Sequence, residues 1–328
     1  MAFRVLMMGT GRFAVPTFRG LLESDNEVVG LITQPDRVAR GRRKHRNAMK
    51  ELAEEHSLPV FQPTNINTDE SKQRLADFDA DLAVVAAYGQ ILSAEVIKTP
   101  RLGCINVHAS LLPRYRGAAP IQHAIIQGET ETGVTIFQIE PKLDAGKILS
   151  VESISIGEDE LYGELEERLS ALAPALLIQV VEQLRDGTTE PLAQDASQVT
   201  KARSFKKSFG LIDWSKTMHL VHCHIRGTQP WPRPFSYLHR PGHKTARLLV
   251  LAVTPREAKP GEPGMPGVAK LIDGALCVSC SDGWLPITTV QPEGKRPMEI
   301  ESFLRGNPIP YGSYFGGEEP RDVDASTT

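Results

Sequence analysis

The sequence is poor in cysteine and has no long apolar run. Four cysteines in 328 residues are too few for the disulfide framework of a secreted module, so we expect reduced thiols. No stretch approaches the roughly 20 apolar residues that cross a bilayer, and the apolar run at 5–8 is much too short for a signal-peptide core. These absences exclude a disulfide-stapled domain and a membrane protein, and they predict a cytoplasmic protein with no membrane partner.

The chain also lacks a strong net charge of either sign. A formal net charge of −3 argues against general affinity for nucleic acid, because sequence-independent phosphate binding needs accumulated positive charge. The segment 37–46 is nevertheless strongly basic and contains no acidic residue. Its cationic side chains are Arg37, Arg40, Arg42, Arg43, Lys44 and Arg46. Such a run is usually a solvated loop, so charge alone leaves a polyanion-binding role open.

The length of the chain and the order of its first apolar segments predict two domains, the first of them α/β. A chain of 328 residues exceeds one comfortable hydrophobic core. Its alternating segments are strand-like runs at 4–8, 27–33, 80–87 and 103–108, and helical stretches at 13–23 and 93–98. This alternation predicts a Rossmann-like parallel sheet covered by helices.

The later segments predict a smaller second domain. Strands at 132–140 and 147–156 and a long helix at 161–184 complete the first domain, and a helix at 215–225 opens the second. Strand-like runs then follow at 247–253, 267–272, 276–281 and 285–290, with Gly and Pro between them. They predict a small OB-like β-barrel. The predicted division is a catalytic domain at 1–189, a polar linker at 190–208, the barrel at 209–312 and an only partly ordered tail at 313–328.

Asn106 and His108 are the first candidate site residues. If 104–108 is a strand, these two side chains share one face, near the carboxyl end where open parallel sheets bind ligands. An amide that donates to a developing oxyanion and an imidazole that moves a proton are the groups required for acyl transfer to an amine. Asp144, in a glycine-containing turn, is the candidate carboxylate to hold the imidazole or a catalytic water. From spacing alone, however, a structural pair is the more common interpretation.

A longer set of motifs resembles the folate-dependent formyltransferase family over nearly the whole chain. The first part of this set surrounds the candidate site residues, at 106–108, 110–113, 116–117, 133–136 and 143–146. Further matching segments lie at 33–37, 59–63, 87–92, 117–122, 212–214 and 230–232. The resemblance is closest to the members that act on an aminoacylated tRNA.

The resemblance implies an activity and a set of residue roles. The implied donor is 10-formyltetrahydrofolate, and the implied acceptor is the α-amino group of methionine on initiator tRNA, which gives formylmethionyl-tRNA for translation initiation. The implied catalytic residues are Asn106, His108 and Asp144. The implied folate pocket contains Ser110, Leu111, Leu112 and Pro113 and the loop Tyr88, Gly89, Gln90, Ile91 and Leu92, although core packing also explains the two leucines. The implied tRNA contacts are Arg37, Arg40, Arg42, Arg43 and Lys44. No metal is implied, and we expect a monomer.

The sequence departs from the family pattern in three places. Ala145 stands where Thr is common between the aspartate and the glycine, which leaves the turn feasible. Arg203 and Ser204 occupy a position where lysine is frequent. The basic segment differs enough that either Arg40 or Arg42 aligns with the critical arginine of the family.

Other functions compete with this interpretation. The turn Gly9-Thr10-Gly11 resembles the start of a dinucleotide fingerprint, but Ala14 replaces its third glycine and no acidic residue ends the next strand. Cys277 and Cys280 resemble half of a zinc site, yet residues three apart on a strand point to opposite faces. A non-catalytic tRNA-binding protein is a third alternative.

Formyltransferases acting on glycinamide ribonucleotide or on an aminosugar nucleotide, and a formyl-folate hydrolase, also stay open. The first would lack a second domain, and the others usually carry a large dehydrogenase domain that we do not expect here.

Overall fold

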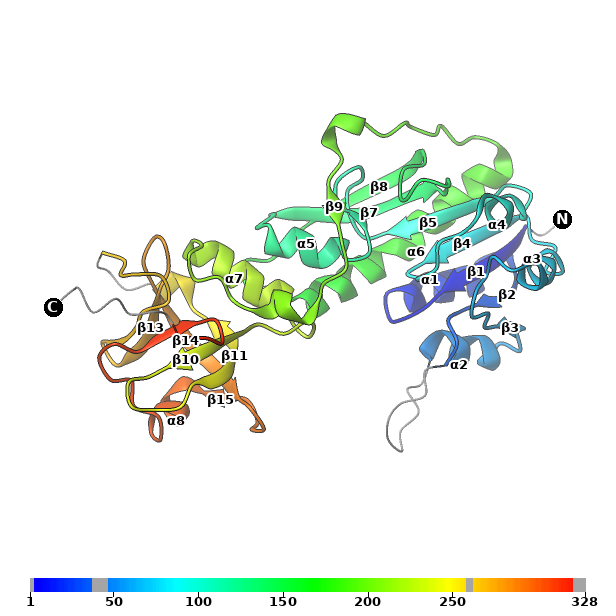
Figure 1. The fold of residues 1–328 in the computed structure, drawn as a ribbon. Coiled ribbons are helices and arrows are strands. Elements are labelled where there is room, and N and C mark those ends of the chain that lie inside the picture. Colours follow the sequence, from blue (N-terminus) through cyan, green and yellow to red (C-terminus); the bar gives the residue numbers. More distant parts are fainter. Residues whose placement is uncertain (1–2, 37–46, 258–261, 321–328) are drawn as a thin grey trace. The chain divides into compact units, whose positions relative to one another are not determined.

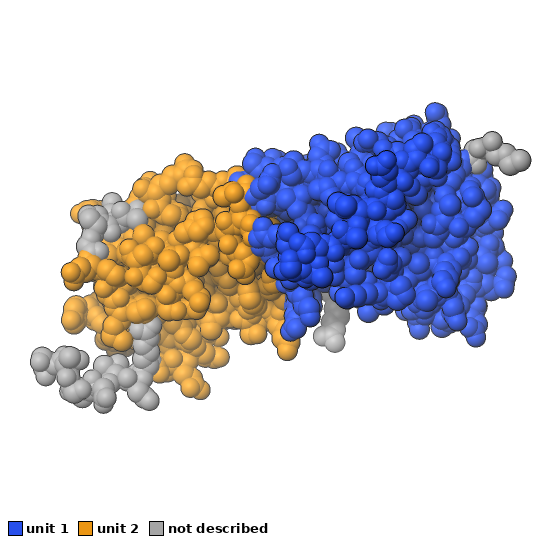
Figure 2. Space-filling view, turned by 90° about the horizontal axis from the view of Figure 1, so that it is seen from above, with its two compact units in different colours: residues 1–121, 131–156, 164–204 blue, residues 122–130, 157–163, 205–328 orange. Residues whose placement is uncertain are grey.

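The computed structural model describes residues 3–36, 47–257 and 262–320, which form two compact units (Figures 1 and 2). Unit 1 takes its described residues from 1–121, 131–156 and 164–204, and unit 2 takes the others. Unit 2 therefore includes two short segments, 122–130 and 157–163, that the sequence places in the catalytic domain. The four-part division of the chain stays a prediction.

The sheet of unit 1 has seven strands in the order β3-β2-β1-β4-β5-β7-β8 (Figure 1). Five of them are parallel: β1 (Arg4–Gly9), β2 (Glu27–Ile32), β3 (Val60–Phe61), β4 (Leu82–Ala86) and β5 (Cys104–His108). Two are added antiparallel at the edge: β7 (Glu131–Gln138) and β8 (Ile148–Ser155). The predicted α/β fold with a parallel sheet is confirmed, and the antiparallel edge is an addition to it.

Helices lie between these strands along the chain or follow the last of them. They are α1 (Ala14–Leu22), α2 (Ala48–Glu55), α3 (Asp69–Ala76), α4 (Ala94–Lys98), α5 (Pro120–Ile126) and α6 (Tyr162–Asp186). The sequence analysis missed α2 and α3, although both begin at capping residues. The side chain of Asn47 accepts from the amides of Met49 and Lys50, and that of Thr68 accepts from Ser71.

The strands pack through alternate apolar side chains, which lie on the same face of neighbouring strands. Leu6 and Met8 of β1 share a buried cluster with Ala83 and Val85 of β4, together with residues of α3 and α4. Burying each large aliphatic side chain contributes about 1.5–3 kcal/mol. On another face α1 approaches α6 closely, since a Cβ at Gly20 would lie 2.8 Å from the Cβ of Pro174. The five parallel strands therefore have their carboxyl ends at one edge of the sheet.

Unit 2 contains an antiparallel sheet in the order β12-β13-β14-β11-β10-β16, with β15 beside β14 (Figure 1). Its strands are β10 (Phe235–His239), β11 (Ala246–Val253), β12 (Ala269–Ile272), β13 (Ala275–Ser279), β14 (Trp284–Pro292), β15 (Met298–Glu299) and β16 (Tyr314–Gly316), and its helices are α7 (Met218–Gly227) and α8 (Ile300–Leu304). A single antiparallel bridge joins Val268 to Tyr314 across the ends of this order. The antiparallel domain is confirmed, whereas a closed OB-like barrel stays a prediction.

Two segments that we expected to be irregular contain short strands. The predicted linker contains β9 (Lys201–Ala202), which pairs with β6 (Arg116–Gly117) of unit 1. The tail expected from 313 begins with β16, which pairs with β10 and buries Phe315 completely. Both segments are held by partners distant in sequence, which local periodicity does not reveal.

Candidate active site

His108 and Asn106 lie at the carboxyl end of β5, on the same face of the strand. In the sheet His108 is opposite Thr135 of β7, and Asn106 is opposite Phe137. The His108 side chain is only 6% exposed and meets the ring of Phe137 edge-on. The Asn106 side chain is half-buried, and no residue in the described part of the chain hydrogen bonds to its amide. An amide donor is therefore available beside a fixed imidazole.

A backbone carbonyl fixes the ring of His108. Its Nε2 lies 3.0 Å from the carbonyl oxygen of Tyr115, and since a carbonyl only accepts, Nε2 is the donor. The other ring nitrogen, Nδ1, lies 4.0 Å from Oδ2 of Asp144, an ion-pair distance that is longer than a hydrogen bond. The sequence analysis assigned the orientation of the ring to Asp144 and missed Tyr115.

Asp144 lies in a tight turn that brings its carboxylate to the 116–117 segment. Its φ of 47° is left-handed, a conformation that aspartate tolerates better than most residues. Its Oδ2 accepts from the amide of Gly117 at 2.7 Å. Gly117 has a φ of 128°, and a Cβ there would lie 2.5 Å from the carbonyl oxygen of Ala202. Glycine at 117 therefore permits the close approach that anchors the carboxylate.

Internal hydrogen bonds shape the loop after β5. Ser110 is fully buried, and its hydroxyl donates to the carbonyl of Arg114 at 2.7 Å. The Thr135 hydroxyl donates to the carbonyl of Ser110 at 2.6 Å and accepts from the amide of Leu112 at 3.1 Å. Leu112 is buried, while Leu111 and Pro113 are partly exposed. The role of Thr135 was missed, although it lies in the motif 133–136.

The loop 88–92 after β4 is anchored at both ends. Tyr88 and Leu92 belong to the buried cluster beneath it. Burial raises the pKa of the Tyr88 hydroxyl far above its usual value, so this side chain is not available as a base. Between the two anchors Gly89 is exposed, and the Ile91 side chain is 78% exposed.

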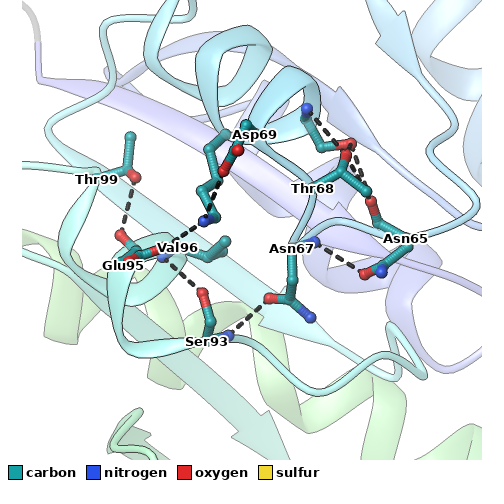
Figure 3. Close-up of polar contacts among 10 residues, drawn as sticks. Asn65, Asn67, Thr68, Asp69, Ser93, Glu95, Val96 and Thr99 are labelled. Carbon is teal, nitrogen blue, oxygen red and sulfur yellow. Dashed lines mark hydrogen bonds and ion pairs between the residues drawn. The ribbon is translucent and has the colours of Figure 1, made fainter.

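The 63–67 segment holds this loop through the Asn67 side chain and through backbone groups. Asn67 donates to the carbonyl of Ile91 at 2.9 Å. It also accepts from the amide of Ser93 at 2.8 Å (Figure 3). Gln90 accepts from the amide of Ile66 and donates to the carbonyl of Pro63. Because its amide is used in this way, Gln90 fixes the loop, whereas the Ile91 side chain stays largely exposed.

The predicted tRNA contacts lie outside the described residues: Arg37, Arg40, Arg42, Arg43 and Lys44. The residues before them follow the carboxyl end of β2, the same edge of the sheet that carries His108. Just before this segment Asp36 binds the ammonium group of Lys50 at 2.9 Å.

The competing motifs have structural surroundings of their own. The Thr10 hydroxyl, in the glycine turn after β1, lies 3.2 Å from that of Thr33 and accepts from the amide of Gln34, so this turn ties two strands together. Cys277 and Cys280 are both buried. In the part of the chain that the structure describes, no three His, Cys, Asp or Glu side chains are grouped to hold a metal ion. Nor does that part contain a helix long and apolar enough to cross a membrane.

The geometry brings together three kinds of polar group at one edge of the sheet. Asn106 supplies a donor, His108 supplies a titratable ring, and Asp144 supplies an anchored carboxylate beside that ring. Acyl transfer to an amine needs a donor for the oxyanion and a path for a proton, and this set contains both.

Comparisons with known proteins agree with this chemistry. A family model described as formyl transferase matches residues 1–181, and one described as formyl transferase, C-terminal domain, matches residues 204–308. The methionyl-tRNA formyltransferase of Nitratidesulfovibrio vulgaris (strain DP4) is 42% identical over 307 residues, which cover 92% of this chain and 92% of that protein. The methionyl-tRNA formyltransferase of Methylococcus capsulatus is also 42% identical, over 93% of this chain and 97% of that protein.

A solved structure shares the fold. It is an N-formyltransferase from Helicobacter canadensis in complex with folinic acid and dTDP-3-aminofucose, with a TM-score of 0.65 and 16% identity over 89% of this chain and 100% of that chain. At this identity the likeness concerns the fold alone, whereas the family models and the two bacterial relatives carry the assignment. The chain therefore belongs to the formyl transferase family, among the methionyl-tRNA formyltransferases.

Proposed function

We propose that this protein transfers the formyl group of 10-formyltetrahydrofolate to the α-amino group of methionyl initiator tRNA, and that it acts as a monomer. The observation that carries the proposal is the convergence of Asn106, His108 and Asp144 at the carboxyl edge of the unit 1 sheet. The names of the relatives, which are 42% identical over more than nine-tenths of the chain, support the choice of acceptor.

In this mechanism the neutral amine nitrogen forms a bond to the formyl carbon. The Asn106 amide donates to the oxygen that becomes negative, and Nδ1 of His108 is the ring nitrogen free to meet that oxygen or the departing proton. Nε2 is occupied by the Tyr115 carbonyl. The Asp144 carboxylate lies 4.0 Å from Nδ1 and so faces this side of the ring. The bond between the formyl carbon and N10 of the folate then breaks, N10 takes a proton, and the amine loses one.

The folate would lie between the two loops that follow β4 and β5. Ile91 of the first loop offers a large exposed apolar surface, and Leu111 and Pro113 of the second loop are partly exposed. Tyr88, Leu92, Ser110 and Leu112 are buried and would shape the pocket from behind. Gly89 and Gln90 complete the first loop, where the backbone is accessible at the glycine. The folinic acid bound to the Helicobacter canadensis protein supports a folate donor.

The basic segment would bind the acceptor end of the tRNA. Arginine suits this role because its planar guanidinium binds phosphate through two hydrogen bonds and also stacks on bases. The described residues 33–36 that lead into the segment follow the carboxyl end of β2, at the edge of the sheet that carries His108, which supports a role in bringing the aminoacyl end to the site. Either Arg40 or Arg42 is the critical residue in this proposal.

The direct test mixes the purified protein with 10-formyltetrahydrofolate and charged initiator tRNA. We expect N-formylmethionine on the tRNA, detected after mild hydrolysis by mass spectrometry. Formylation of an aminosugar nucleotide in place of the tRNA would overturn the acceptor, and release of formate without an amine product would indicate a hydrolase.

The basic segment has a separate test. Replacing Arg40 and Arg42 by alanine is expected to weaken the use of Met-tRNA about tenfold or more and to reduce its salt dependence, because fewer phosphates are neutralised. Folate binding should be unchanged. The matched control replaces Arg74 and Arg185, two exposed arginines of unit 1, by alanine. It removes the same positive charge as the first double variant. Equal salt dependence in the two double variants would contradict the assignment.

A further inference from the structure

The side chain of Gln194 joins two segments of unit 1 that build the site. Its Nε2 donates to the carbonyl of Asp144 at 2.9 Å and to the carbonyl of Gly146 at 2.7 Å. Its Oε1 accepts from Nε of Arg116 at 3.1 Å and from Nη2 of the same guanidinium at 2.7 Å. Both N–H groups and the oxygen of the amide are therefore engaged, and a single side chain bridges the 144–146 turn to the 116 segment.

The residues that follow Gln194 hold the same segment from the backbone side. Thr200 accepts from the amide of Tyr115 through its hydroxyl at 2.8 Å and from the amide of Arg116 through its carbonyl at 3.0 Å. The strand pair β6 and β9 continues this contact as far as Gly117. The segment 194–202 thus positions the Tyr115 carbonyl that meets His108 and the Gly117 amide that meets Asp144.

The Asp144 turn depends on such outside support. The left-handed φ of Asp144 is not the favoured conformation of a residue with a side chain. The turn is also tightly packed, because a Cβ at Gly146 would lie 1.7 Å from the carbonyl oxygen of Gln138. One amide group bonds two carbonyls of this turn, so the backbone that carries the catalytic carboxylate is held from a point 50 residues away in sequence.

We propose that Gln194 is a positioning residue for formyl transfer, which sets the distance between the Asp144 carboxylate and His108 by bridging the 144–146 turn to Arg116. The inference rests on the proposed function. A glutamine suits position 194 because the bridge needs two N–H donors toward the carbonyls of the turn. It also needs an oxygen that accepts hydrogen bonds from the Arg116 guanidinium. Glutamate keeps the acceptor and loses the donor, while leucine loses both.

The test measures single-turnover formylation by Gln194→Glu and Gln194→Leu at saturating folate and Met-tRNA, from pH 6 to 9. Both variants should be about tenfold slower or more, with folate affinity within twofold of wild type. The midpoint of their pH–rate profiles should differ measurably from that of wild type, because proton transfer depends on how the carboxylate and the imidazole are placed. A loss of stability alone would leave this midpoint unchanged.

The matched control is Gln229→Leu. The Gln229 amide likewise donates to two carbonyls, those of Ile225 and Leu251, but within unit 2. Its rate and pH midpoint should match wild type. Hydrogen exchange of the peptide covering 140–148 provides a second measurement, which should be faster in Gln194→Leu and unchanged in the control.

The outcomes separate the two proposals. If the wild-type protein formylates Met-tRNA and both Gln194 variants share its rate, pH midpoint and exchange, the positioning role is overturned and the proposed function stands. If the wild-type protein transfers no formyl group, the proposed function falls and this inference falls with it.

Discussion

Two buried histidines of this protein each face an aspartate, one in each unit. His108 of unit 1 lies 4.0 Å from Asp144, and His222 of unit 2 lies 3.4 Å from Asp159. The two rings are almost equally buried, at 6% and 7% exposure. Judged by distance and burial alone, His222 would be the better candidate for a catalytic pair.

The surroundings distinguish the two pairs. The Asp144 side chain is 11% exposed and is tied by the Gly117 amide, whereas the Asp159 side chain is 64% exposed and is shared with Arg256 at 3.4 Å. Desolvation by burial and, to a lesser extent, the charge of Arg226 lower the pKa of His222 to about 4, although Asp159 opposes both. A histidine next to an aspartate is therefore not a site by itself. An anchored carboxylate, an oriented ring and a free amide donor set the His108 pair apart.

The largest expected effect is on the rate of formyl transfer, which should depend on the His108–Asp144 pair and not on the His222–Asp159 pair. His108→Ala, Asn106→Ala and Asp144→Asn should each lower the single-turnover rate about a hundredfold or more, because each removes a group that acts on the developing charge or the proton. His222→Ala should stay within about threefold of wild type at pH 7.5. Near-wild-type rates in all three unit 1 variants would remove the distinction and the proposed site with it.

The next effect concerns stability in acid. The folded-state pKa of His222 lies near 4 and its ordinary value is 6.5, so between these values the unfolded state binds more protons. The free energy of unfolding therefore rises with pH between about 4 and 6.5. It decreases as the pH falls from about 6.5 to 4, because protonation of His222 then favours the unfolded state. The loss should be on the order of 2 kcal/mol, and His222→Gln should remove it.

Tryptophan fluorescence can follow the unfolding of unit 2 separately. All three tryptophans, Trp214, Trp231 and Trp284, lie in unit 2, so urea unfolding followed by their emission reports on that unit. The midpoint of the wild-type protein should fall between pH 7 and pH 4.5 by more than that of His222→Gln. Parallel pH dependence in the two proteins would contradict the assignment to His222.

The smallest expected effect is the slow reaction of one buried thiol in each unit, which reports on local opening of that unit. Cys104 of unit 1 and Cys280 of unit 2 are buried, and burial raises the pKa of each thiol to about 12. Since the thiolate is the reactive form, neither should react measurably with a thiol reagent at pH 8 until its unit opens locally. Mass spectrometry of Cys104→Ser and Cys280→Ser would assign the labelled site, and rapid labelling of both thiols in the native protein would refute this view.

Several features of the fold could be predicted from local patterns. The apolar runs located β1, β2, β4 and β5, since buried parallel strands consist of short apolar segments bounded by turns. The alternation along β5 placed Asn106 and His108 on one face. The caps at Asn47 and Thr68 were visible in the sequence but were overlooked because their helices are short and polar.

What the sequence by itself determined is the type of each main element, the edge of the sheet where the candidate site lies and the family to which the chain belongs. These depend on residue spacing within a few positions and on motifs that stand in one stretch. The tertiary structure alone decided how the site is held. The carbonyl of Tyr115, the hydroxyl of Thr135 and the amide of Gln194 act on groups 7, 25 and 50 residues away. Hydrogen bonds over such separations form only when the fold brings the segments together, so local sequence patterns do not predict them.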